Sequence, residues 1–220
     1  MKQYKVGMIR VLTTQDPELL ALHGKLIEGY FPMLKVDSRC LPDQPEGIYN
    51  DETMAIAIPK IVAMAKEMYS EGYEALIISC AGDPGVEEAR RAVPIPVVGG
   101  GASTAALSLF YGSRPAALGI TPDMPEGYVR VFRDRAVGSG RGAGVESVLD
   151  LMAPAGYQAT LNAAQEMKTQ GADVIALSCT GMSTLKIAPA MEKALGIPVL
   201  DPVMCEGLLT LFELLRREAQ

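Results

Sequence analysis

Short apolar runs alternate along the chain with longer segments in which apolar residues recur at helical spacing. The runs are rich in β-branched residues and are bounded by polar turns, which is typical of strands. They span 4–12, 33–40, 73–79, 95–99, 116–121, 172–178 and 197–201. A segment such as 16–31, with Asp16 placed to cap and Pro17 at the first position, predicts a helix. The alternation predicts an α/β fold with parallel sheets. We expect a loop from Arg133 to Gly144.

The chain repeats its own pattern. Glu67-Met68, Gly72, Ser79-Cys80 and Gly82 recur 99 residues later as Glu166-Met167, Gly171, Ser178-Cys179 and Gly181. Beyond these turns the offset grows by three residues, so that Ile95-Pro96-Val97 recurs as Ile197-Pro198-Val199. Two copies are too few for a solenoid. They predict two similar lobes that face each other across a cleft.

Composition and charge limit the kinds of binding partner that we expect for this protein. The chain has 220 residues, 49% of them hydrophobic, a net charge of −6 and no run of Lys or Arg, which argues against binding to nucleic acid. No window approaches the roughly 18 apolar residues of a membrane span, and the N-terminus does not resemble a signal peptide. We therefore expect a cytoplasmic protein whose four cysteines stay reduced.

Cys80 and Cys179 are the candidate catalytic residues. Each directly follows a predicted strand and precedes a turn with glycine at the second following position. A free cysteine is most often an inert core residue. However, ligands of open α/β sheets bind at the carboxyl ends of strands, and a helix N-terminus favours a thiolate. The duplicated placement therefore indicates a functional pair. A disulfide is not expected in a reducing compartment. A zinc site with Cys40 and Cys205 would need closely spaced cysteines, which the sequence lacks. We expect Cys40 and Cys205 to pack in the core or at its edge.

Other polar and glycine-rich positions carry weaker signals. His23 lies in the middle of a predicted helix, where a structural role is expected, and the chain holds no other histidine for a Ser-His-Asp or Cys-His site. The glycine stretches at 97–104 and 138–144 lack the spacing of nucleotide-binding loops, although the first could form a backbone nest for a carboxylate. The loop at 45–51 adds Tyr49 and Asn50 as possible contacts. Hydroxyls at strand ends could ring the cleft and bind a small polar ligand: Thr13, Thr14, Ser79, Thr121, Ser178 and Thr180.

Two facing thiols can invert a stereocentre next to a carbonyl. A thiolate removes the proton from one face, and a thiol returns a proton to the other face, so that neither a metal nor another cofactor is required. Cysteine suits both roles because its unperturbed pKa, about 8.5, is close to neutrality. The amides of the two turns, at Ala81, Gly82, Thr180 and Gly181, could donate hydrogen bonds to the enolate oxygen.

The segments "SCAGDPGVEEAR" (79–90), "PVVGGG" (96–101), "SCTGMSTL" (178–185) and "GIPVLDPV" (196–203) are similar to those of the aspartate/glutamate/hydantoin racemase superfamily, and most of all to its hydantoin and allantoin racemases. The resemblance covers nearly the whole chain. It implies two pseudo-symmetric Rossmann- or flavodoxin-like lobes, with Cys80 and Cys179 as a catalytic acid/base pair that uses no cofactor. It further implies a C-terminal helix that packs on the first lobe, and a homo-oligomer.

These inferences predict a first lobe of residues 1–98 and 206–220, and a second lobe of residues 99–205. The predicted activity is racemisation of a 5-substituted hydantoin or related cyclic ureide, a neutral ring that suits a cleft without an evident Arg or Lys clamp. Three alternatives stay open: an amino-acid racemase for aspartate or glutamate, a maleate-isomerase-like enzyme, and a non-catalytic two-lobed ligand-binding protein.

Overall fold

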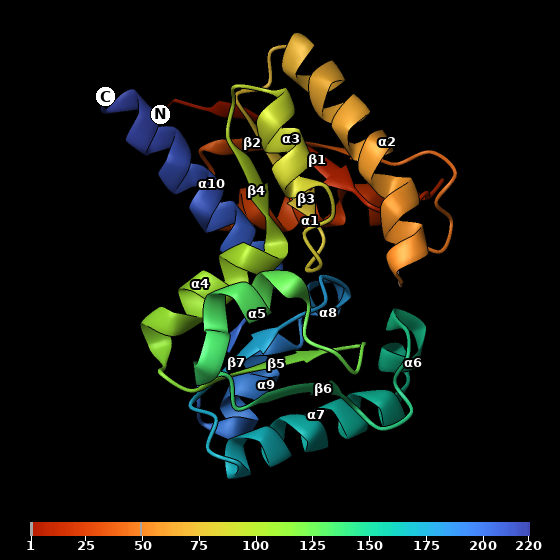
Figure 1. The fold of residues 1–220 in the computed structure, drawn as a ribbon, viewed down its shortest axis with the longest axis vertical. Coiled ribbons are helices and arrows are strands. Elements are labelled where there is room, and N and C mark those ends of the chain that lie inside the picture. Colours follow the sequence, from red (N-terminus) through yellow and green to blue (C-terminus); the bar gives the residue numbers. More distant parts are fainter. Residues whose placement is uncertain (1, 49) are drawn as a thin grey trace. The chain divides into compact units, whose positions relative to one another are not determined.

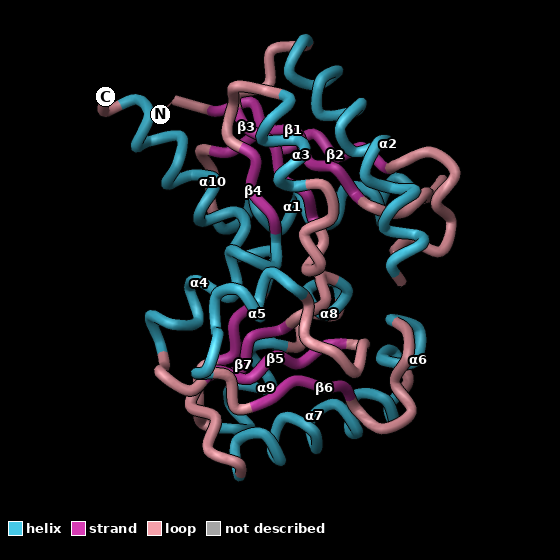
Figure 2. Tube along the Cα trace, viewed as in Figure 1, coloured by secondary structure: helices cyan, strands magenta, loops and turns pink. Residues whose placement is uncertain are grey.

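The computed structural model describes residues 2–48 and 50–220. It confirms the predicted α/β fold, because it contains two four-stranded sheets in which every paired strand is parallel (Figures 1 and 2). The chain divides into two compact units. Unit 1 comprises Met1–Gly100 and Glu206–Gln220, and unit 2 comprises Gly101–Cys205.

Unit 1 is built on a sheet with the strand order β2-β1-β3-β4. Its strands are β1 (Tyr4–Arg10), β2 (Leu34–Cys40), β3 (Ala75–Ser79) and β4 (Val97–Gly99). Its helices are α1 (Pro17–Tyr30), α2 (Asp51–Ser70), α3 (Val86–Ala92) and all but the first four residues of α10 (Pro202–Glu218). Arg10, the last residue of β1, pairs with Ser79 of β3 on one side and with Cys40 of β2 on the other.

The two faces of this sheet differ in polarity. Alternate strand residues, including Ile9, Leu76 and Ile78, join the apolar core with buried residues of α2 and α3. Figure 1 shows these two helices in front of the sheet. The intervening positions, Arg10 and Ser79 among them, point to the opposite face because side chains alternate along a strand. Helices α1 and α10 cover that face and contribute side chains or carbonyls that bond to its polar end.

Unit 2 repeats the architecture with the strand order β6-β5-β7-β8. Its strands are β5 (Pro115–Gly119), β6 (Gly138–Arg141), β7 (Val174–Leu177) and β8 (Val199–Leu200). Its helices are α4 (Gly100–Tyr111), which begins at the last residue of unit 1, α5 (Glu126–Phe132), a 3₁₀ turn (Arg133–Arg135), α6 (Val148–Met152), α7 (Pro154–Thr169), α8 (Gly181–Thr184) and α9 (Ala188–Leu195). The core lies between β5 and β7 on one side and α7 and α9 on the other.

One predicted element is wrong. The sequence from Arg133 to Gly144 was expected to be a loop, but it contains the edge strand β6, which pairs with β5 from Gly138 to Arg141. All four residues of β6 are half-buried, and the two glycines among them bury no side chain. The strand therefore depends on backbone pairing with β5, and its sequence shows no alternation of apolar residues that would predict a strand. No helix among residues 2–48 and 50–220 is long and apolar enough to span a membrane.

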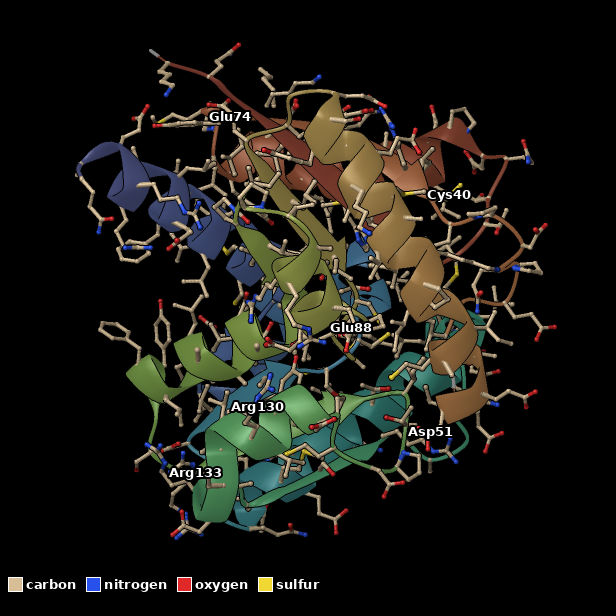
Figure 3. All side chains as sticks on the ribbon, turned by 45° about the horizontal axis from the view of Figure 1, so that its top comes forward. Cys40, Asp51, Glu74, Glu88, Arg130 and Arg133 are labelled. Carbon is tan, nitrogen blue, oxygen red and sulfur yellow. The ribbon has the colours of Figure 1, made fainter. Side chains whose placement is uncertain are left out.

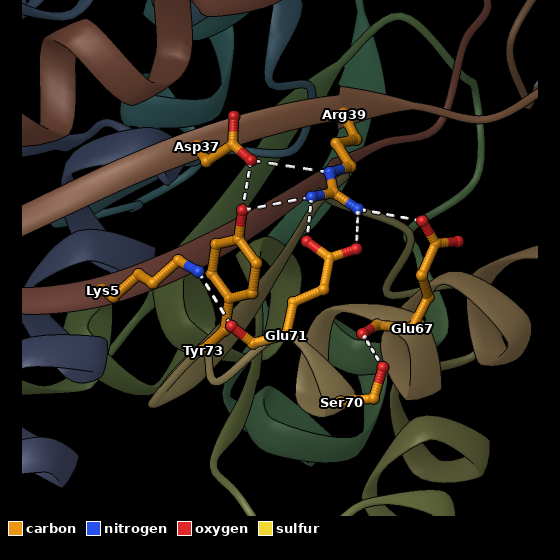
Figure 4. Close-up of polar contacts among 7 residues, drawn as sticks. All are labelled: Lys5, Asp37, Arg39, Glu67, Ser70, Glu71 and Tyr73. Carbon is orange, nitrogen blue, oxygen red and sulfur yellow. Dashed lines mark hydrogen bonds and ion pairs between the residues drawn. The ribbon is translucent and has the colours of Figure 1, made fainter.

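An exposed ion network ties the end of α2 to β2 in unit 1 (Figure 4). The Arg39 guanidinium donates to the carboxylates of Glu67 at 3.1 Å and Glu71 at 2.9 Å, and to the Tyr73 hydroxyl oxygen at 3.3 Å. Asp37 accepts a hydrogen bond from the Tyr73 hydroxyl. The hydrogen bond with Glu71 raises the pKa of Arg39 and lowers the pKa of the Glu71 carboxyl. This network stabilises unit 1 locally and lies on its surface.

Candidate active site

Cys80 directly follows β3 in unit 1 and is half-buried. Its backbone N–H donates to the Ile78 carbonyl at 2.9 Å, and its carbonyl accepts from the Asp83 N–H at 3.1 Å. The chain therefore turns sharply at the cysteine, as the Gly-Pro-Gly-rich sequence predicts. Ala81 is buried and Gly82 is half-buried. A Cβ atom built on Gly82 would lie 3.7 Å from the Cys80 sulfur, so that the turn follows the thiol closely.

Cys179 occupies the corresponding turn after β7 in unit 2, and it too is half-buried. At the start of α8, the Met182 N–H donates to the Cys179 carbonyl at 3.0 Å. Burial raises the pKa of Cys179, and the nearby N–H groups of Gly181 and Met182 oppose that effect. A Cβ atom on Gly181 would overlap with the Val148 side chain, which explains the glycine at this position.

The other two cysteines lie elsewhere in the two units, and none of the four forms a disulfide. Cys205 is 3% exposed in α10, in agreement with the core position expected for it. Cys40 ends β2 and is half-buried (Figure 3), and its thiol contacts the Thr14 carbonyl at 3.7 Å.

Thr13 and Thr14 already have partners within unit 1. The Thr13 hydroxyl donates to the Leu41 carbonyl at 2.6 Å and accepts from the Gln44 N–H at 2.7 Å. The Thr14 hydroxyl oxygen accepts from the Asp16 N–H at 3.1 Å. These bonds hold the 41–44 segment against the end of β1, and a ligand would have to compete with them for either hydroxyl.

In unit 2, the predicted hydroxyls also lie at turns. Thr121 donates to the Asp123 carbonyl at 3.0 Å, and Thr180 is the half-buried residue that precedes α8. In the loop before α2, the Asn50 side chain accepts from the Thr53 N–H at 2.8 Å and therefore caps that helix. Tyr49 lies outside the described residues.

The glycine stretch after β4 serves close packing within unit 1. A Cβ atom on Gly99 would overlap with the Asp83 carboxylate, and one on Gly100 would lie 2.7 Å from Glu206 Oε2. The chain's own carboxylates thus approach the backbone at the start of α4. A position next to helical N–H groups is favourable for an anion. The backbone nest predicted at 97–104 therefore has two of the chain's own carboxylates, Asp83 and Glu206, as neighbours.

Four buried polar residues cluster at the carboxyl ends of β1 and β3, on the face of the sheet that α1 and α10 cover. Arg10 is 4% exposed, His23 1%, Ser79 2% and Glu206 fully buried. Arg10 Nη1 donates to the carbonyls of Leu19 at 3.0 Å and Leu20 at 3.2 Å.

Hydrogen bonds connect three members of this cluster. Ser79 Oγ donates to Glu206 Oε1 at 2.7 Å, and His23 Nδ1 lies 2.9 Å from the same hydroxyl oxygen. Since a carboxylate only accepts, the Ser79 proton points to Glu206, and His23 must donate through Nδ1. Burial and the nearby Arg10 charge hold the pKa of His23 well below its ordinary value, so that the imidazole is neutral. The chain of hydrogen bonds from His23 through Ser79 to Glu206 links α1, β3 and α10.

Neither Arg10 nor Glu206 was predicted as a site residue, and only a structural role was predicted for His23. Signals for the first two were present. Arg10 interrupts the apolar run of the first strand. Glu206 shares a helical face with the buried Val203, Thr210 and Leu214, at spacings of three and four residues. A charge on a buried face needs a partner, and this rule would have pointed to both residues.

Comparison with known proteins places the chain in a family. Residues 20–206 match the family described as Asp/Glu/Hydantoin racemase. A hydantoin racemase of Pseudomonas sp. (strain NS671) is 29% identical over 71% of this chain and 64% of its own length, slightly less than two thirds. A hydantoin racemase of Rhizobium meliloti is 27% identical over 76% of this chain and 73% of its own length.

Solved structures with the same fold include two racemases. An allantoin racemase from Klebsiella pneumoniae has a TM-score of 0.81 at 20% identity, covering 96% of this chain and 87% of its own. A glutamate racemase from Bacillus anthracis has a TM-score of 0.68 at 14% identity, covering 99% of this chain and 84% of its own. At such identities the likeness shows the fold alone. The match over residues 20–206 goes further: the chain belongs to the Asp/Glu/hydantoin racemase family.

Proposed function

We propose that the protein racemises a 5-substituted hydantoin or a related cyclic ureide without a cofactor, with Cys80 and Cys179 as the two bases. The observation that carries this proposal is the duplicated cysteine turn. Cys80 directly follows β3, and Cys179 lies two residues after the end of β7, at the sheet ends where α/β proteins bind ligands. Membership of a racemase family and the hydantoin racemases among the relatives support the reaction and the substrate class.

The chemistry moves one proton off carbon and another onto it. The thiolate of one cysteine takes the proton from the ring carbon C5, and the electron pair of the C–H bond passes into the adjacent carbonyl as an enolate. The thiol of the other cysteine gives its proton to the opposite face of C5, which inverts the centre and leaves a thiolate there. The next turnover runs in the reverse direction, or proton exchange with water restores the starting state.

Stabilisation of the enolate is the second requirement. Backbone N–H groups in a fixed turn cost no reorganisation when charge develops, and one oxyanion donor contributes on the order of 3 kcal/mol in acyl-transfer enzymes. The turn after Cys80 offers the N–H groups of Ala81 and Gly82. In the second turn, the N–H groups of Gly181 and Met182 at the start of α8 lie near Cys179 and would favour the negative charge when that thiol ionises.

The test is racemisation and isotope exchange by the wild-type protein in heavy water. Single enantiomers of a 5-alkyl hydantoin, allantoin, aspartate and glutamate are incubated separately, with a no-enzyme control for spontaneous racemisation. For a hydantoin or allantoin, we expect the optical rotation to be lost and deuterium to be incorporated at C5. Exchange of aspartate or glutamate instead would reassign the substrate class. Saturable binding without any exchange would contradict the proposal in favour of a ligand-binding protein.

A further inference from the structure

Helix α8, which follows Cys179 in unit 2, has only four residues. Two backbone hydrogen bonds hold its start: the Met182 N–H donates to the Cys179 carbonyl at 3.0 Å, and the Ser183 N–H donates to the Thr180 carbonyl at 3.1 Å. Because a first helical turn fixes several dihedral angles for each bond that it gains, a helix of this length is not stable by itself. The turn that presents Cys179 therefore needs support from the rest of unit 2.

A buried side-chain hydrogen bond supplies such support. Ser183 is 1% exposed, and its hydroxyl donates to Asp201 Oδ1 at 2.9 Å. Asp201 directly follows β8, the strand that pairs with β7, and directly precedes α10. The same carboxylate oxygen accepts from the N–H groups of Val203 at 2.9 Å and Met204 at 3.0 Å. One oxygen atom thus joins the turn after β7 to the first turn of α10.

In unit 1, a carboxylate occupies the corresponding position but belongs to the turn itself. The offset of 102 residues that relates Ile95 to Ile197 places Gly99, the last residue of β4, opposite Asp201. A Cβ atom on Gly99 would overlap with the Asp83 carboxylate, which therefore lies against the end of β4. Asp83 is part of the cysteine turn, because its N–H donates to the carbonyl of the cysteine at 3.1 Å. Strand β4 pairs with β3 as β8 pairs with β7.

The carbonyl of Cys80 also approaches the helix that follows β4. A Cβ atom on Gly100, the first residue of α4, would lie 3.4 Å from the Cys80 carbonyl oxygen. The start of a helix carries partial positive charge, which favours such oxygen atoms. In each unit, the cysteine turn is therefore held at the start of the helix that follows the neighbouring strand, and a carboxylate lies at the junction.

We propose that Asp201 and Asp83 are positioning residues, each of which fixes the turn of one cysteine by joining it to the end of the neighbouring strand. Asp201 acts through Ser183 on the Cys179 turn, and Asp83 acts from within the Cys80 turn. This inference rests on the proposed function, because a two-base racemase needs both thiols held in place.

Fixing each turn matters because misplacement of a reacting group by about 1 Å can cost about 10²-fold in rate. A loosened Cys179 turn impairs protonation by that thiol and leaves Cys80 intact. For the enantiomer whose C5 proton Cys80 removes, the new Cys80 thiol then exchanges its proton with heavy water and returns deuterium to the same face. Loosening one turn therefore increases exchange without inversion for one enantiomer only.

The experiment follows exchange and inversion of each pure enantiomer of a 5-alkyl hydantoin in heavy water. Ser183→Ala removes the bond to α8 and leaves the two N–H bonds to Asp201 in place. We expect inversion to fall about tenfold, and the ratio of exchange to inversion to rise about tenfold for one enantiomer, the one that Cys179→Ser also exchanges. Asp201→Ala should act in the same way. Asp201→Asn keeps an Oδ1 acceptor and should restore most of the inversion.

Variants of unit 1 should select the opposite enantiomer. Asp83 has a φ of 52°, which glycine adopts without strain, so that Asp83→Gly removes the carboxylate at little backbone cost. It should raise the ratio for the enantiomer that Cys80→Ser exchanges, and Asp83→Asn should restore inversion.

Ser108→Ala is the matched control for Ser183→Ala. Ser108 is also buried in unit 2, and its hydroxyl donates to the Thr104 carbonyl at 2.7 Å within α4. Its loss should change the ratio for neither enantiomer. Circular dichroism and thermal melting establish that each variant is folded.

Wild-type ratios in folded Ser183→Ala, or an equal rise for both enantiomers, would overturn the proposal. If Ser183→Ala does not fold, Asp201→Ala and Asp83→Gly decide by the same criteria. If the wild-type protein does not racemise the hydantoin, the proposed function fails, and hydrogen exchange measured by mass spectrometry tests the positioning separately. Ser183→Ala should then speed amide exchange in a peptide spanning 179–186 about fivefold, and Ser108→Ala should not. An unchanged exchange rate in Ser183→Ala would overturn the positioning role.

Discussion

Unit 1 and unit 2 place a cysteine at corresponding turns of the same fold, yet the residues around the two turns differ. At the ends of β1 and β3, just before the Cys80 turn, lie the buried Arg10 and a chain of hydrogen bonds from the buried His23 through Ser79 to Glu206. In unit 2, β5 ends in Gly119, and α8 begins at Gly181, after the Cys179 turn. The turn is therefore duplicated, whereas the polar residues next to it differ.

The comparison separates what the repeat supplies, which is the placement of a cysteine after a strand, from what differs between the units. At the strand ends next to the two turns, Arg10 and Ser79 of unit 1 correspond to Gly119 and Ser178 of unit 2. The buried polar residues of unit 1 therefore belong to one copy of the repeat and are not part of the repeated pattern.

The largest expected effect comes from removing either sulfur. Cys80→Ala and Cys179→Ala should each lower the rate of hydantoin inversion on the order of 10²- to 10⁴-fold, the usual contribution of a general acid or base. Cys40→Ala is the matched control, because Cys40 ends a strand next to Arg10 but belongs to no turn, and it should retain most of the rate. Polarimetry with single enantiomers measures all three. An undiminished rate in either of the first two variants would show that the pair is not catalytic.

A smaller effect is expected from breaking the support of one turn but not of the other. Ser79→Ala removes the hydroxyl that links His23 to Glu206 and leaves both buried groups short of a partner, at a cost of about 1–3 kcal/mol of unfolding free energy. Ser178→Ala, at the half-buried counterpart in unit 2, should cost less than about 1 kcal/mol. Urea denaturation of the two variants compares them. Equal losses would mean that the two turns are supported alike.

The neutral state of His23 predicts a dependence of stability on pH. Its folded pKa lies well below 6.5, so that the folded and unfolded states are both neutral above that pH and stability is full. As the pH falls below 6.5, the unfolded state takes up a proton that the folded state refuses, and stability falls by up to about 1.4 kcal/mol per pH unit. His23→Asn, which keeps a donor near the position of Nδ1, should flatten this slope.

Denaturant unfolding at several pH values between 5 and 6.5 measures this slope. His23 is the only histidine of the chain, so that no other imidazole contributes. Asp201, whose pKa is raised by burial, adds a slope of the opposite sign that wild type and variant share. Identical slopes for the two proteins would contradict the neutral assignment of His23.

The smallest effect is expected at the other arginine of the same sheet end. Arg39 lies one residue before the strand partner of Arg10, but its ion network is exposed (Figure 4). Exposed ion pairs contribute little and are screened by salt. Arg39→Met should lower the melting temperature only slightly at low ionic strength and not at all at about 1 M NaCl, where the Debye length is about 3 Å. A loss that persists in high salt would show that the network contributes more than exposed charge.

The sequence was sufficient for the fold class and for the cysteine turns, because both depend on local patterns. Alternating apolar runs with turn residues predicted seven of the eight strands, and the repeat brought out Cys80 and Cys179. The strand β6 escaped because two glycines in four residues carry no hydrophobic signal. The Arg10 cluster escaped for a different reason: its members lie 13 to 196 residues apart in the chain and are brought together only by folding, so that no window of sequence contains them.

The most direct test of the two-base account uses conservative variants and one face of the substrate at a time. Cys80→Ser and Cys179→Ser are each incubated in heavy water with the two pure enantiomers of a 5-alkyl hydantoin, and deuterium at C5 is followed by NMR beside optical rotation. Each variant should exchange the C5 proton of one enantiomer without inverting it, and the two variants should select opposite enantiomers. Normal inversion by either variant, or exchange of the same enantiomer by both, would contradict the account.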